Sequence, residues 1–185
     1  GYLHEVLFYN RNLTDAEILK VNTYLAIKYG ATLQNAGGGA QGDYVATNGS
    51  IVWDASLSPS YHNDVFGIAR DDSEALLQKQ AHAFDDTARV YVSTLQTSNA
   101  ANSGTFIADG SYVVMGDNKG ATQPTTASNL EMPTGTILTN RMEREWKITK
   151  TNFGQTFSCD IMPSNAFARN PPNCLQLWVD DDGDF

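Results

Sequence analysis

The sequence predicts a mostly β protein, an antiparallel β-sandwich with one N-terminal α-helix at about residues 15–29. First, short β-branched and aromatic runs recur after residue 43, and turn signals such as Asn48-Gly49 and Asp109-Gly110 separate them. Second, only the segment near the N-terminus has the apolar spacing of a helix. Third, 41% hydrophobic residues with 10% aromatics supply a proper core for a single chain of 185 residues.

The helix has recognisable start and stop signals. Thr14 and Glu17 have the spacing of a capping box, in which each side chain bonds the backbone N–H of the other residue. Gly30 follows at the position where a left-handed conformation ends a helix. Between these signals one apolar stripe recurs at helical spacing: Ile18, Val21, Leu25 and Tyr29.

The remaining elements are predicted from composition and punctuation. Residues 2–9 are aromatic and β-prone, which predicts a strand before the helix. Residues 34–42 are glycine-rich and predict a loop or linker. Further strands are expected at residues 43–46, 50–54, 64–69, 75–82, 88–94, 111–116, 141–149, 156–161 and 175–179, with a threonine-rich surface loop at 121–128.

Two stretches of the chain carry a family resemblance. The first runs from Gly1 through Glu5-Val6 to Tyr9-Asn10-Arg11 and continues with Leu13-Thr14 and Glu17. It resembles the closing segment of a laminin-G or concanavalin-like lectin jelly roll. The second comprises Val52-Trp53-Asp54, residues 61–72, residues 77–80 and residues 144–148. It is similar to a poorly characterised β-rich module that follows such lectin-like domains in large bacterial surface proteins.

The resemblance implies architecture and location rather than chemistry. It divides the chain into residues 1–33, the closing strand and helix of a lectin-like domain, and residues 43–185, a β-sandwich module. It carries no sugar site here, because the binding loops of the lectin-like domain would lie upstream. The chain is thus interpreted as part of a much larger polypeptide, and neighbouring domains of that polypeptide are its expected partners.

Charge and polarity agree with an extracellular or bacterial cell-surface location. Only 18% of the residues are charged, and Asn, Thr, Ser and Gly supply most of the polarity, which is typical of secreted proteins. The formal net charge of -9 disfavours nucleic-acid and anionic-lipid partners and favours cations. No apolar run approaches the ~20 residues that cross a bilayer, so membrane insertion is not expected.

The sharpest chemical motif lies at the C-terminal end. Asp180, Asp182 and Asp184 stand at positions 1, 3 and 5 of a D-x-D-G-D sequence, the spacing that lets alternate carboxylates converge on one calcium ion. Gly183 eases the tight turn, whereas Phe185 stands where a calcium loop usually has glycine. The motif predicts a calcium site, and the alternative is a solvated acidic turn.

Two polar pairs flank one predicted strand. Asn63 and Asp64 precede the apolar run at residues 65–68, and Asp71 and Asp72 follow it. Such side chains can supply oxygens to a metal or hydrogen bonds to a sugar. They equally serve to cap turns and to pair with arginine, so both interpretations stay open.

Cys159 and Cys174 are the two cysteines of the chain. In an extracellular setting they are expected to form a disulfide, which would stabilise the fold by roughly 3 kcal/mol in the chain-entropy model. The alternative is a pair of buried free thiols. No histidine pair lies near the two cysteines in the sequence, as a zinc site with two cysteines would need.

Signals for catalysis are sparse, and no enzymatic activity is expected. The sequence contains no G-x-S-x-G elbow, no H-E-x-x-H motif and no phosphate-binding glycine loop. Trp53, Trp146 and Trp178 stand in apolar surroundings and are expected in the core. The leading hypothesis is a structural or adhesive module of a multidomain surface protein. The alternative is a carbohydrate-binding module, calcium-assisted, that takes surface glycans; a host or matrix protein is a third class of partner.

Overall fold

The fold is known from a computed structural model, which describes residues 4–33, 42–126, 140–162 and 177–180. The N-terminal half of the described chain holds helix α1 (Asp15–Tyr29), strands β1 (Tyr44–Val45), β2 (Ile51–Trp53) and β3 (Asn63–Asp71), the 3-10 turn η2 (Asp72–Glu74), and strands β4 (Leu76–Gln78), β5 (Gln80–His82) and β6 (Ala88–Tyr91). The second half holds β7 (Ser111–Asp117), β8 (Pro124–Thr126), β9 (Asn140–Met142), β10 (Trp146–Thr151) and β11 (Ser158–Ile161).

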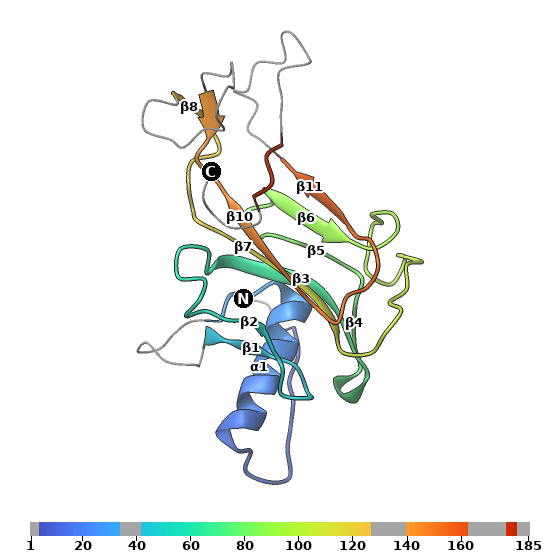
Figure 1. The fold of residues 1–185 in the computed structure, drawn as a ribbon. Helices are drawn as coiled ribbons and strands as arrows, with labels where there is room; N and C mark the ends of the chain where they lie inside the picture. Colours follow the sequence, from blue (N-terminus) through green and yellow to red (C-terminus); the bar gives the residue numbers. More distant parts are fainter. Residues whose placement is uncertain (1–3, 34–41, 127–139, 163–176, 181–185) are drawn as a thin grey trace.

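All strand pairs are antiparallel. The central sheet has the order β10-β7-β3-β4, and a second sheet has the order β11-β6-β5 (Figure 1). The described strands also form two two-stranded sheets, β1-β2 and β8-β9. The fold is therefore mostly β with one N-terminal helix, and both the β-sandwich prediction and the predicted helix bounds are confirmed.

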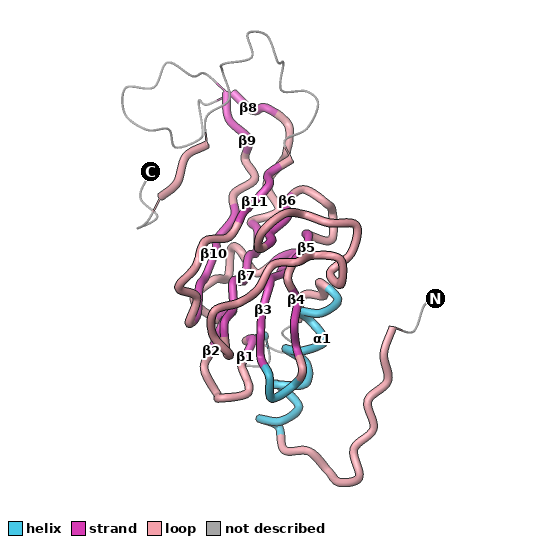
Figure 2. Tube along the Cα trace, turned by 90° about the vertical axis from the view of Figure 1, so that its right-hand side faces the viewer, coloured by secondary structure: helices cyan, strands magenta, loops and turns pink. Residues whose placement is uncertain are grey.

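The central sheet is buried on both faces. On one face, Val65 and Val114 pack with Ile27 of α1 and Trp53 of β2 in what we call the helix-side core. On the other face a second set of buried residues forms the sheet-side core, in contact with the three-stranded sheet: Phe66, Ile68, Val90, Val113 and Met115. Burial on both faces explains why β3 and β7 are continuous apolar runs rather than alternating ones. Figures 1 and 2 show α1 and the three-stranded sheet in different layers.

Helix α1 begins and ends where its sequence signals predict. Both bonds of the capping box between Thr14 and Glu17 are present, and Gly30 adopts φ 62°. The buried side chains of the helix are Thr23, Ala26 and Ile27. They attach α1 to the helix-side core, where Thr23 Oγ1 also accepts a hydrogen bond of 2.8 Å from the backbone N–H of Val45.

Several predicted elements differ from the structure. Residues 4–9 pair with none of the described strands, so the expected N-terminal strand is not formed within this chain. The expected strand at 75–82 is two strands, β4 and β5, which belong to different sheets and meet at Lys79. The expected loop at 121–128 contains β8, and residues 177–180 are not in a strand. Each difference depends on which other strand a segment pairs with. The sequence pattern of the segment itself does not specify that partner.

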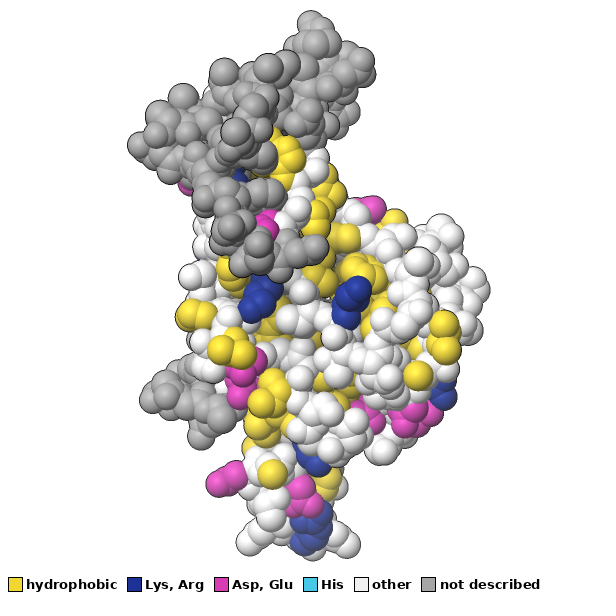
Figure 3. Space-filling view, in the orientation of Figure 1, with side chains coloured by type: hydrophobic (Ala, Val, Ile, Leu, Met, Phe, Trp, Pro, Cys, Tyr) yellow, Lys and Arg dark blue, Asp and Glu magenta, His cyan; other side chains and the backbone are white. Residues whose placement is uncertain are grey.

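The surface agrees with the lean charge composition. On the face shown in Figure 3, uncharged polar side chains and backbone predominate, and charged side chains lie in small separate groups. Trp53 is buried in the helix-side core at 1% exposure, as predicted, while Trp146 is half-buried against the sheet-side core. Trp178 is also half-buried.

Candidate functional site

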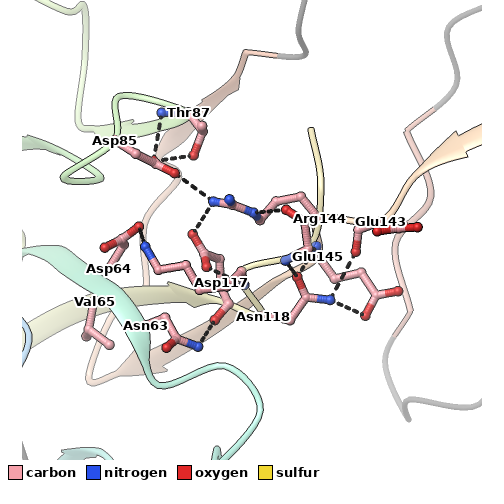
Figure 4. Close-up of polar contacts among 12 residues, drawn as sticks. Asn63, Asp64, Val65, Asp85, Thr87, Asp117, Asn118, Glu143, Arg144 and Glu145 are labelled. Atoms are coloured by element: carbon pink, nitrogen blue, oxygen red, sulfur yellow. Dashed lines mark hydrogen bonds and ion pairs between the residues drawn. The ribbon is translucent and has the colours of Figure 1, made fainter. Parts of the chain in front are cut away.

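Five charged side chains from distant parts of the sequence meet at one end of the central sheet (Figure 4). We call them the charged cluster: Asp64, Asp85, Asp117, Lys119 and Arg144. Asp64 lies at the start of β3 and Asp117 ends β7, whereas Asp85 belongs to the turn between β5 and β6. The antiparallel register of β3 and β7 places Asn63 opposite Asp117, which brings the two ends together.

Arg144 is the centre of the cluster. Its Nη1 lies 2.8 Å from Asp85 Oδ2 and 2.7 Å from Asp117 Oδ2, and its Nε donates a hydrogen bond of 2.7 Å to the carbonyl of Gly120. Its side chain is only 9% exposed. One arginine therefore joins the end of the central sheet to a turn of the three-stranded sheet.

Asp117 is the most deeply buried acid of the cluster, at 1% exposure. Burial raises the pKa of its carboxyl group, against the opposite effects of the Lys119 backbone N–H and the Arg144 guanidinium. The Lys119 N–H donates to Asp117 Oδ1 at 2.8 Å, and Lys119 Nζ pairs with Asp64. Each carboxylate of the cluster thus has a cationic partner.

The backbone is unusual where the charged cluster forms. Asp64 has φ 44° and Lys119 has φ 57°, both in the left-handed region that non-glycine residues rarely adopt. The pairing of β3 with β7 is irregular between Asn63 and Phe66. Asn63 Nδ2 donates a hydrogen bond of 3.0 Å to the carbonyl of Asp117 at this point. The surrounding contacts therefore hold the strand end in a conformation of higher local energy.

The charged cluster has the composition of a cation site. Oxygens of Asp64, Asp85 and Asp117 all lie within 4.8 Å of one another, and carboxylate oxygens are the ligands that calcium prefers. Lys119 and Arg144 already contact these carboxylates. A metal ion would therefore compete with Lys119 and Arg144 for these carboxylates. The geometry fits a set of ion pairs that stabilises the fold better than it fits an open metal centre.

The predicted calcium ligand Asp180 lies near this end of the sheet. The pKa of Tyr61 is raised by burial, by the charge of Glu145 and, more weakly, by the charge of Asp180. The Tyr61 hydroxyl donates a hydrogen bond of 3.1 Å to Glu145. Asp182 and Asp184 lie outside the described residues. The calcium site therefore stays a prediction.

The four predicted ligand residues of β3 form two separate groups. Asn63 and Asp64 lie at the charged cluster, while Asp71 and Asp72 lie at the other end of the strand. Asp71 lies seven residues after Asp64, which corresponds to roughly 23 Å of extended strand. The four side chains do not converge on one ligand.

Protein donors already occupy the second group. Asp71 is 1% exposed and accepts hydrogen bonds from Thr47 N at 2.9 Å, Thr47 Oγ1 at 2.6 Å and Tyr112 Oη at 2.8 Å. Asp72 pairs with Arg70 at 2.7 Å. Both residues therefore tie loops and strands together, the structural alternative considered for them.

The side chains of Cys159 and His62 pack within the fold and form no open site. Cys159 Sγ lies 3.9 Å from Met115 Sδ, and burial raises the pKa of a thiol at this position to about 11. Cys174 lies outside the described residues, so the disulfide stays a prediction. His62 Nδ1 accepts a hydrogen bond of 3.0 Å from the Trp53 indole, and its Nε2 contacts the carbonyl of Leu33 at 2.7 Å. Both ring nitrogens of His62 thus serve the core.

No local pattern in the sequence connects Asp85 or residues 116–120 to Arg144, because these positions are far apart along the chain. The irregular backbone at Asp64 also leaves no mark in the sequence pattern. Tertiary structure brings these residues together: β3 and β10 both pair with β7, with Asn63 and Trp146 opposite Asp117, and Asp85 comes from a turn of the other sheet.

Comparisons with known proteins identify the family but no activity. None of the described helices is long and apolar enough to cross a membrane. No curated protein and no solved structure matches the chain. A family model described as a domain of unknown function (DUF8202) matches residues 17–185, so the chain belongs to this family.

Proposed function

We propose that this chain is a structural, adhesive module of a large extracellular or bacterial surface polypeptide, and that it is not an enzyme. In this proposal residues 1–33 end a laminin-G-like unit and residues 43–185 form the β-sandwich module that follows. The module spaces and orients its neighbours, and a rigid connection at α1 transmits that orientation.

The observation that carries the proposal is the way in which α1 holds the chain that enters it. Glu5 accepts hydrogen bonds from Tyr24 Oη at 3.0 Å and Tyr29 Oη at 2.8 Å, and its carboxylate lies 2.9 Å from Lys28 Nζ. These contacts lower the pKa of Glu5, with the bond from Lys28 as the largest cause. His4 also packs on the ring of Tyr29, with ring centroids 5.2 Å apart.

The other face of the same helix is fixed to the module. Ala26 and Ile27 are buried at 1% and 0% exposure in the helix-side core. The same helix therefore bonds to the incoming chain through polar side chains and packs on the sandwich through apolar side chains. This arrangement supports a mechanical role, because it links the direction of residues 4–9 to the orientation of the sheets.

The charged cluster supports the same role. Arg144 joins Asp85, in the turn between β5 and β6, to Asp117 of the central sheet. Its Nη1 lies 2.8 Å from a carboxylate oxygen of Asp85 and 2.7 Å from one of Asp117. Such cross-links between layers favour a stiff module.

Small-angle scattering on the chain together with its natural N-terminal neighbour tests the proposal. We expect one narrow distribution of interdomain distances, which Glu5→Ala broadens while the melting temperature of the module stays unchanged. The matched control is Asp15→Ala, since Asp15 is also an acid near the helix start. Independent motion of the two units in the unmutated protein would contradict the proposed joint.

A glycan array with and without calcium separates this proposal from the carbohydrate-binding alternative. We expect no reproducible binding. Binding that one aromatic substitution abolishes would instead assign the chain to the carbohydrate-binding class.

A further inference from the structure

A groove lies between helix α1 and the segment that precedes it. This segment runs back alongside the helix (Figures 1 and 2). The groove has a volume of about 470 Å³ and is also lined by Ser73 and Glu74 of the turn η2. Glu5, which carries the proposed joint, does not line it. The groove is therefore separate from the joint and has the size of a small-molecule site.

Glu74 lines this groove with a carboxylate that has no partner among the described residues. Its side chain is half-buried, and no hydrogen bond or ion pair from the described chain reaches its oxygens. Burial, and more weakly the charge of Asp71, raise the pKa of Glu74 to about 7, against the opposite effect of Lys20. Withdrawing a carboxylate from water without a hydrogen-bond donor is unfavourable. A ligand that brings a positive charge to Glu74 would remove this cost.

The cations of the groove are already engaged. Arg11 donates two hydrogen bonds to the carboxylate of Glu17, at 2.9 and 2.6 Å. Lys20 Nζ donates a hydrogen bond of 2.6 Å to the carbonyl of Thr47. Once Arg11 and Glu17 neutralise each other, Lys20 faces two carboxylates, Glu74 and Asp71. The groove therefore carries a net negative charge, which favours a cationic ligand over an anionic one.

The other walls of the groove are apolar and aromatic. Leu7 and Val21 line it, and so does Tyr9, which is 50% exposed. The face of a tyrosine ring attracts an ammonium group. On the same helix Lys28 Nζ already lies 4.8 Å from the centroid of the Tyr24 ring. Walls of this kind fit an apolar chain that ends in a positive charge.

We propose that the groove between α1 and the segment before it binds a primary ammonium group carried on an apolar chain, with Glu74 as the partner of the charge. The apolar chain packs on Leu7 and Val21. A lysine side chain of another protein and a small aliphatic amine share this chemistry.

A chemical-shift titration of the isotope-labelled chain with butylammonium chloride tests the site. We expect saturable shifts at Glu74 and its neighbours in the groove at pH 8. At pH 5, where Glu74 is protonated and the amine keeps its charge, the affinity should fall by roughly tenfold or more. The other charged or titratable groups around Glu74 are the two groove tyrosines, Arg11, Glu17, Lys20, Asp71 and Tyr112. Glu74→Gln separates its titration from theirs, because it should remove the pH dependence.

Two matched substitutions locate the charge that binds the amine. At pH 8 Glu74→Gln is expected to weaken binding by roughly tenfold or more, because a hydrogen bond to a charged group is lost. Asp15→Asn removes the same charge from an exposed residue of α1 that does not line the groove, and should change the affinity by less than about twofold. Chemical shifts that are otherwise unchanged in Glu74→Gln show that the fold is preserved.

Neutral butanol and Nα-acetyllysine amide complete the test. Butanol binding as tightly as butylammonium would overturn the proposal, as would equal affinities of Glu74→Gln and the unmutated chain or the absence of saturable shifts. If Nα-acetyllysine amide binds as butylammonium does, the groove takes a lysine side chain of a protein partner. Binding of butylammonium alone assigns it to a free amine.

Discussion

Replacing Arg144 with methionine tests whether the charged cluster holds the two sheets together. The substitution keeps much of the side-chain volume but leaves the carboxylate of Asp117, 1% exposed, without its guanidinium partner. Removing one member of a buried ion pair costs about 3–5 kcal/mol. The Lys119 N–H still bonds Asp117, and Asp85 is 29% exposed and can be rehydrated. We therefore expect a loss of about 3 kcal/mol, near the lower end of that range.

Urea denaturation at pH 7, followed by tryptophan fluorescence, measures this loss. The control is Arg70→Met, because Arg70 also pairs with an aspartate, at 2.7 Å, but its side chain is 33% exposed and that of Asp72 is 54% exposed. An exposed pair of this kind contributes about 0–1 kcal/mol. Adding Asp117→Asn to Arg144→Met should recover part of the loss, since the buried charge is then gone. Equal small losses for Arg144→Met and Arg70→Met would refute the reasoning.

Three further predictions concern other parts of the molecule. A Cβ at Gly116 would lie 2.3 Å from the Tyr61 carbonyl oxygen, so Gly116→Ala should lower the free energy of unfolding by about 3 kcal/mol, whereas Gly154→Ala, with nothing within 4 Å, should be nearly neutral in the same urea assay. Burial and a neighbouring carboxylate raise the pKa of Glu74 from 4.5 to about 7. The folded state therefore binds the extra proton, stability falls as the pH rises from 4.5 to 7, and Glu74→Gln should stabilise by about 1–2 kcal/mol at pH 8 but not at pH 4. If the C-terminal acidic motif binds calcium, excess calcium should raise the melting temperature above its value in EDTA, and Asp182→Asn should remove the rise; identical melting in both buffers would exclude the site.

Local sequence determined the elements whose stabilising contacts lie within a few residues. The helix is an example: Thr14 and Glu17 are three residues apart, and Gly30 bonds back to Ala26 within the last turn. The apolar runs of β3 and β7 likewise predicted strands. The mostly β class and the single helix follow from these local signals.

Tertiary structure decided which of these elements meet. The bonds of Arg144 to Asp117 and Asp85 span 27 and 59 residues. They exist because β10 pairs with β7 in the register that puts Trp146 opposite Asp117, and because the turn between β5 and β6 of the other sheet meets this end of the central sheet. The separation of β4 and β5 into different sheets at Lys79 was settled in the same way. Residues 4–9 have the sequence of a strand but pair with none of the described strands, because strand formation requires a neighbour as well as a propensity. Propensity is a property of the segment, whereas pairing and burial are properties of the whole fold.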